Sequence, residues 1–149
     1  MRKKQKRAGM RSSFAYTLAP VLGYFIAHVI KYILASRRQQ NWKIFFKSGN
    51  MPSSHTAVVI SLVSVIFFHE GLTDLMAVAG TFAAIIIYDA LVVRRSVGEL
   101  GVAMVHVLEE SKSKGKRPFV ALGHKPLEVV AGGVLGITIG FFVAFFITK

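Results

Sequence analysis

Three short segments of this chain carry residues that could handle a phosphate group. In the first, KSGNMPSSHT (47–56), a turn containing Gly and Ser leads into a predicted helix. Free backbone N–H groups and the positive end of the helix dipole make such a start an anion site. Ser53 or Ser54 can cap the helix or donate to an anion, Lys47 adds a cation, and His55 lies in the first turn. A capped helix with an incidental histidine is the alternative for this segment taken alone.

The second segment, LGHKPLEV (122–129), places a histidine and a carboxylate four residues apart. If a helix begins by Gly123 or His124, this spacing puts His124 and Glu128 on one face. Glu128 can then accept a hydrogen bond from one ring nitrogen and leave the other free as a nucleophile or base. The alternative is an ion pair at a helix start that has no part in catalysis.

The third segment, DALVVRR (89–95), ends a long apolar run with paired arginines. Arginines in that position are ordinarily interfacial anchors. The guanidinium fork also fits phosphate oxygens, and Asp89 about one turn back could orient it. We therefore predict that Arg94 or Arg95 binds phosphate, with Asp89 in a supporting role.

Metal or cofactor chemistry finds little support in the sequence. The chain has no cysteine, no His-Glu-x-x-His motif and no Walker-type glycine loop. The two candidate histidines stand beside basic residues and not among further carboxylates. We expect no metal and no cofactor.

These segments must be positioned by helices in a membrane. Of 149 residues, 53% are hydrophobic and only 17% are charged, which excludes an ordinary soluble domain. The first apolar run has 22 residues, about 33 Å of helix, and matches a hydrocarbon core of about 30 Å. A cleaved signal peptide is the alternative for that run. The predicted all-α fold is a multi-pass transmembrane bundle of about four spans: 14–35, 55–68 extended back to Pro52, 75–93 and 129–148.

Two further segments complete the expected organisation. Residues 1–13 contain six Lys and Arg and are predicted to be a flexible basic tail, so that 14–149 form a single membrane domain. Residues 96–110 alternate apolar and polar positions at helical spacing, which favours an amphipathic helix at the membrane interface. With four spans, both chain ends lie on one side and the loops 36–54 and 94–125 meet on the other.

The last span carries Gly132, Gly136 and Gly140 on one face. Glycines at that spacing allow another helix backbone to approach closely, either within the monomer or across a homodimer. The net charge of +12 indicates an anionic partner. Membrane lipids and a lipid phosphate substrate fit this charge better than nucleic acid, because the tail has no aromatic residue before Phe14. We expect an integral protein of the cell membrane.

The three segments together resemble the divergent PAP2 family, small membrane proteins related to the type 2 phosphatidic acid phosphatases. The resemblance spans roughly residues 42–136 and implies His55 as general acid, His124 as nucleophile and Glu128 as the carboxylate that orients it. Ser54 stands where the superfamily has glycine, and Glu128 where it has aspartate. A Lys-x6-Arg-Pro block is absent, so the phosphate ligands would come from Lys47, Arg94 and Arg95.

The function predicted from the sequence is a metal-independent phosphatase acting on a lipid phosphate or pyrophosphate through a phosphohistidine. The alternative is a non-catalytic membrane protein that binds or carries an anionic lipid in the same pocket. These two predictions share one site and differ only in whether turnover occurs.

Overall fold

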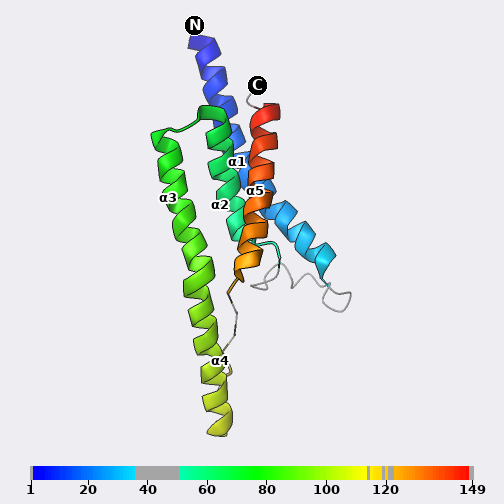
Figure 1. The fold of residues 1–149 in the computed structure, drawn as a ribbon, viewed down its shortest axis with the longest axis vertical. Helices are drawn as coiled ribbons and strands as arrows, with labels where there is room; N and C mark the ends of the chain where they lie inside the picture. The colour runs from blue at the N-terminus through cyan, green and yellow to red at the C-terminus, as the bar shows by residue number, and fades with distance from the viewer. Residues whose placement is uncertain (1, 36–50, 114, 119, 121–122, 148–149) are drawn as a thin grey trace.

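The computed structural model describes residues 2–35, 51–113, 115–118, 120 and 123–147, with the backbone alone for residues 2–10. The described residues form helices and no strand, so the predicted all-α class is confirmed. In chain order the elements are α1 (Arg2–Leu34), α2 (Ser54–Glu70), α3 (Asp74–Tyr88), a π-helical turn (Asp89–Val93), α4 (Arg94–Glu110) and α5 (Pro126–Ile147) (Figure 1).

Within the part of the chain that the structure describes, three helical segments are long and apolar enough to cross a membrane, namely Arg11–Leu34, Asp74–Glu110 and Pro126–Ile147. The fourth apolar helix, α2, has 17 residues and is therefore about 25 Å long. The four predicted apolar runs thus correspond to α1, α2, α3 and α5. Among the described residues they form the helical membrane bundle that the composition indicated.

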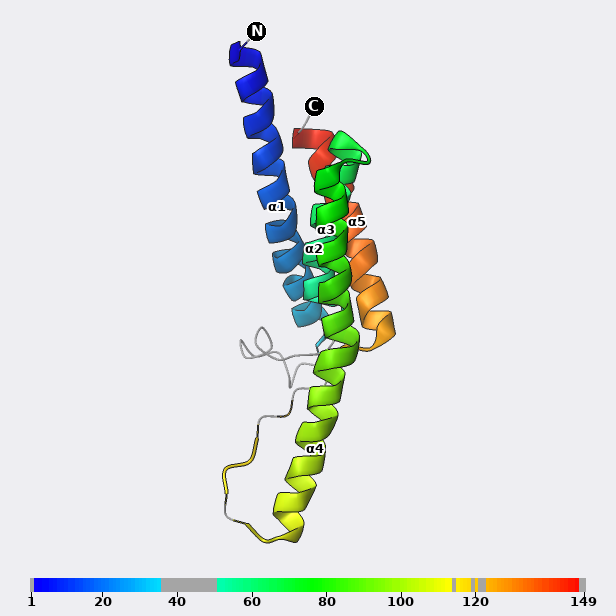
Figure 2. The same ribbon diagram turned by 90° about the vertical axis from the view of Figure 1, so that its left-hand side faces the viewer.

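Helix α2 lies at the centre of the bundle and contacts α1, α3 and α5 (Figures 1 and 2). Its contact with α5 depends on the glycines of α5. A Cβ added at Gly136 would lie 2.9 Å from the carbonyl oxygen of Ala57, and one at Gly140 would lie 2.8 Å from the amide nitrogen of Val65. The glycines therefore bring two helix backbones together inside one chain, the first of the two alternatives. Association of two copies through the same face would require α2 to leave α5.

Both chain termini lie at one end of the bundle (Figure 1). Near this end the apolar core contains Ala15, Ala19, Val65, Ile66, Ile139, Val143 and Ala144. The Tyr16 hydroxyl contacts Nδ1 of His69 at 2.8 Å and donates to Glu70 at 2.5 Å, which links α1 to the end of α2. The starts of α2 and α5 lie at the opposite end, so the two histidine segments share one end of the molecule.

The structure differs from the sequence prediction at two elements. Residues 2–13, predicted as a flexible tail, are helical and continuous with the first apolar run. Residues 96–110 do form a helix, but α4 continues α3 and extends past the other helices (Figure 2). Residues 89–95 contain neither Pro nor Gly, so nothing in this segment ends the helix.

Candidate active site

The start of α2 forms one wall of the site. Ser53 caps the helix, because its Oγ accepts from the Thr56 amide at 3.4 Å and from the Thr56 hydroxyl at 3.0 Å. The neighbouring Ser54 hydroxyl accepts a hydrogen bond from Lys31. His55 lies in the first turn of α2 and is exposed. Of the two serines, Ser53 is therefore occupied by the helix start, while Ser54 faces a cation.

His124 is buried beside the start of α5, with 3% of its surface exposed. Its Nδ1 lies 2.8 Å from Oε2 of Glu128, and the Lys125 amide donates to the same oxygen at 3.2 Å. The spacing predicted that the two side chains would share one face of a helix. Helix α5 begins only at Pro126, however, so the two side chains meet across the helix start. The Glu128 carboxylate lies in the first turn of α5.

The π turn supplies the backbone contact that holds His124. In a regular α-helix the Arg94 amide would donate to the carbonyl of Ala90, but here it donates to the carbonyl of Asp89. The Ala90 oxygen is thereby released, and it accepts a hydrogen bond from the His124 amide at 3.2 Å. A local irregularity between α3 and α4 thus positions a histidine more than thirty residues later.

Close approach of the two backbones also requires Gly123. A Cβ at this position would lie 2.6 Å from the amide nitrogen of Arg95 and 2.9 Å from its Cα. Any other residue would push the segment before α5 away from α4. Gly123 is therefore a structural part of the site that the sequence prediction did not include.

The two histidine segments are joined to each other. The Ser53 amide donates to the backbone carbonyl of Glu128 at 2.8 Å. The ring centroids of His55 and His124 lie 6.4 Å apart with the planes inclined at 63°. One phosphoryl group could contact both rings at this separation.

The cations predicted to bind phosphate differ in the partners that the structure gives them. Nε of Arg94 lies 2.8 Å from Oδ2 of Asp89, the orienting contact that the sequence predicted. Arg95 instead pairs with Glu99 at 3.1 Å along the exposed side of α4. Lys47 lies outside the described residues. The charge of Arg94 acts on both His55 and His124, so Arg94 is the arginine that lies near the histidines.

A second cation, Lys31, was missed as a site residue. It lies in the last turn of α1, is 5% exposed, and its Nζ is 3.4 Å from Oγ of Ser54. Its charge acts on both His124 and Glu128. The available signal was a lysine inside an otherwise apolar run, which in membrane helices usually marks a functional site. The sequence could not show that its neighbours lie 23 and more residues away.

The surroundings of His124 favour the neutral imidazole. Burial lowers its pKa below the ordinary value; the hydrogen bond with Glu128 opposes this shift, and the charges of Lys31 and Arg94 reinforce it. With Nδ1 donating to the carboxylate, Nε2 carries the lone pair. Nε2 of His124 is thus an unprotonated ring nitrogen near neutral pH.

The described side chains around the two histidines do not form a set of metal ligands. Within the described part of the chain, no group of three or more His, Asp or Glu side chains is placed to hold a metal ion. The site instead offers a neutral histidine, a second histidine and two cations. These are groups for phosphate binding, nucleophilic attack and proton transfer.

Fold and composition together define an integral membrane protein built from apolar helices, with its polar site at one end of the bundle. The sequence model of the divergent PAP2 family matches residues 7–139, and the chain belongs to that family. This confirms the resemblance drawn from the three segments. The uncharacterized membrane protein YuiD of Bacillus subtilis (strain 168) is 33% identical over an alignment of 125 positions, which covers 73% of this chain and 79% of YuiD. No solved structure matches the chain.

Proposed function

We propose that this protein is a metal-independent phosphatase of the cell membrane that hydrolyses a lipid phosphate or pyrophosphate through a phosphohistidine. The observation that carries the proposal is the buried His124, which is bonded through Nδ1 to Glu128 and lies beside the ring of His55. That contact fixes the tautomer whose Nε2 can attack phosphorus. Family membership supports a relation to lipid phosphatases.

The reaction has two steps. In the first, Nε2 of His124 attacks phosphorus, the bond from phosphorus to the leaving oxygen breaks, and His55, protonated in the complex with the anionic substrate, gives its proton to that oxygen. In the second, water attacks the phosphohistidine, His55 accepts a proton from the water, and the bond from phosphorus to nitrogen breaks. Inorganic phosphate leaves, and both histidines return to their starting states.

Charge neutralisation supplies most of the rate enhancement in this scheme. General acid–base help contributes about 10²- to 10⁴-fold, so electrostatic stabilisation must account for more. Lys31, Arg94 and the backbone amides at the start of α2 are the groups we assign to the phosphoryl oxygens, with Lys47 and Ser54 as further ligands. Arg95 could join them only by leaving Glu99.

The first test is phosphate release by the purified protein in detergent with a metal chelator present. The substrates are a lipid monophosphate, a polyprenyl pyrophosphate and the soluble p-nitrophenyl phosphate. We expect release from at least one lipid, complete loss in His124→Ala, and a smaller loss in His55→Ala with p-nitrophenyl phosphate, whose leaving group needs no proton. Rapid quenching of a ³²P-labelled substrate should trap label on His124.

Two results would contradict the proposed phosphatase mechanism. If the wild type binds anionic lipid vesicles but releases no phosphate from any of these substrates, the protein is a binding or carrier protein that uses the same pocket. Release that continues undiminished in His124→Ala would remove the phosphohistidine from the mechanism.

A further inference from the structure

Helix α4 carries an exposed apolar stripe on the part of the chain that projects from the bundle. Its members recur at alternating spacings of four and three residues, which is the spacing of a coiled-coil seam. They are Val93, directly before α4, and Val97, Leu100, Met104 and Val107 within it, and each is between 44% and 70% exposed. These five residues are called the α4 seam below.

The other faces of α4 are either covered or charged. One face lies against the chain that returns to α5, where a Cβ at Gly101 would lie 3.3 Å from Cγ2 of Val120. At about 100° per residue, the ionisable residues of α4 other than Arg94 fall on the side away from the seam. They are Arg95, Glu99, His106, Glu109 and Glu110. The seam is therefore an apolar, uncharged and exposed face of its own.

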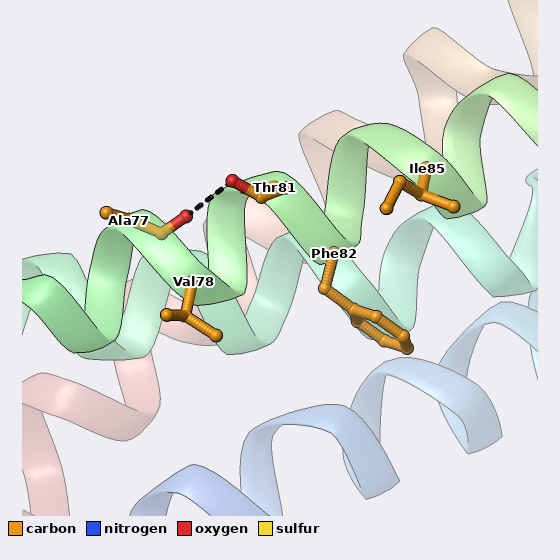
Figure 3. Close-up of a pocket in the computed structure, with 5 residues that line it drawn as sticks. All are labelled: Ala77, Val78, Thr81, Phe82 and Ile85. Atoms are coloured by element: carbon orange, nitrogen blue, oxygen red, sulfur yellow. Dashed lines mark hydrogen bonds between the residues drawn. The ribbon is translucent and has the colours of Figure 1, made fainter.

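Lipid does not cover the seam as it covers α3. On α3 the exposed side chains of Val78, Phe82 and Ile85 line an open hollow (Figure 3) and need no protein partner, because lipid tails are equally apolar. The continuous helix Asp74–Glu110 has 37 residues, or about 55 Å, and exceeds a hydrocarbon core of about 30 Å by about the length of α4. Because α4 continues α3 and does not fold back (Figure 2), it stands away from the membrane surface. In a single copy the seam would face water.

We propose that the α4 seam is the interface of a homodimer, in which the α4 helices of two copies form a short parallel coiled coil outside the membrane. A second copy in the same membrane presents the same face in the same direction, so the two seams meet in register about a two-fold axis. A β-branched residue at one seam position and leucine at the next, here Val97 and Leu100, favour two strands. The flanking residues Ser96, Gly101 and Ala103 carry no charge, so the axis brings no like charges together.

This dimer does not use the glycine face of α5, which α2 occupies, and it does not depend on the proposed function. Residues 93–107 span two heptads, fewer than the roughly three or four that ordinarily define a coiled coil. Anchoring in one bilayer compensates, because it raises the effective concentration of the two helices and fixes their direction. The dimer fraction should therefore rise with the protein-to-lipid ratio and fall in excess detergent.

Single cysteines in vesicles test the interface, since the natural chain has none. A disulfide requires Cα atoms within about 7 Å, so Val97→Cys, Leu100→Cys and Met104→Cys should each give a crosslinked dimer under a mild oxidant. Glu99→Cys and His106→Cys lie on the charged side of the same helix and should stay monomeric at the same protein-to-lipid ratio. Equal crosslinking at seam and control positions, or none at the seam, would overturn the proposal.

Counting subunits by single-molecule photobleaching gives a readout without crosslinks. Leu100→Glu should lower the dimer fraction at least about tenfold, because the two glutamates would face each other across the axis. Val102→Glu adds the same charge on the far side of α4 and should leave the dimer fraction unchanged. Leu100 is 70% exposed, so its substitution should not lower the melting temperature of the dilute protein in detergent. A monomeric wild type in which Met104→Cys resists maleimide would show that another occupant covers the seam, and the homodimer would be wrong.

Discussion

At the residue scale, the buried cation at the end of α1 is the feature of the candidate site that the sequence prediction lacked. Lys31 is almost fully buried, and among the described residues its Nζ contacts the neutral hydroxyl of Ser54, while the charge of Glu128 acts on it. A charge removed from water with incomplete pairing costs stability. A site that binds a phosphoryl group recovers that cost when the anion arrives.

Lys31→Met should therefore separate function from stability. We expect kcat/KM for the lipid phosphate to fall about 10²- to 10³-fold, because one cation facing the phosphoryl oxygens is lost. The melting temperature in detergent should be equal to or above that of the wild type, because an apolar side chain of similar length replaces a buried charge. Lys125→Met, which removes an exposed cation nearby, should change kcat/KM by less than about twofold. A stability loss in Lys31→Met with unchanged turnover per folded molecule would make the lysine structural.

Glu128→Gln tests the orienting role of the carboxylate. Glutamine can still accept from the His124 ring and the Lys125 amide, so the melting temperature should stay close to that of the wild type. It cannot supply the negative charge that stabilises the imidazolium, and turnover should fall about 10²- to 10⁴-fold. Kinetics of the purified variant, normalised to folded protein, measure this. Turnover near the wild-type value would remove Glu128 from the mechanism.

At the scale of elements, the pairing of α2 with α5 is what brings the two histidines together. Gly136 meets the backbone of α2, whereas a Cβ added at Gly133 on the same helix would meet nothing within 4 Å. The contact is therefore confined to one face of α5.

Gly136→Ala and Gly133→Ala form a matched pair of substitutions. Gly136→Ala should destabilise the protein by about 1–3 kcal/mol through overpacking and should lower phosphatase activity, because the starts of α2 and α5 move apart. Gly133→Ala should leave both properties unchanged or slightly improved. Thermal unfolding in detergent and turnover of the folded fraction measure the two effects. Equal destabilisation by the two substitutions would show that α5 does not dock through its glycine face.

The elements also show what the sequence could and could not predict. Apolar run lengths were sufficient for α1, α2, α3 and α5, because the membrane imposes helix length directly. The π turn was not predictable, since five ordinary residues, Asp89–Val93, carry no local signal for an extra residue in a helical turn. Its role depends on the His124 amide, which approaches from a distant part of the chain.

The residues of the candidate site also divide into those that the sequence could predict and those that it could not. His55, His124 and Glu128 were predictable because they lie in short segments with a recognisable spacing. Lys31 and Gly123 were not, since each acts on groups that only the folded chain brings near. Arg94 and Arg95 are adjacent and chemically alike in the sequence, and only the geometry of α4 distinguishes their partners.

At the scale of the whole molecule, both termini and the turn between α2 and α3 lie at one end, while α4 projects from the other (Figure 1). Cysteines introduced at Leu72 and Ser113 should therefore react with an impermeant maleimide from opposite sides of the membrane. Leu72 is 84% exposed, and the wild-type chain has no cysteine to give background labelling. Labelling of both positions from the same side would contradict a bundle in which α3 crosses the membrane.

The shortness of α2 places the reaction at a particular depth. A helix of about 25 Å falls about 5 Å short of an average hydrocarbon core, and His55 lies in its first turn. If the proposed reaction takes place and the other end of α2 lies at the far interface, the scissile phosphate is drawn below the plane of the surrounding headgroups. In that case we expect hydrophobic mismatch to contribute to the activation barrier. Turnover in vesicles of short-chain phosphatidylcholines should exceed turnover in long-chain ones when substrate and surface density are held constant, and no dependence on bilayer thickness would place His55 at the headgroup level.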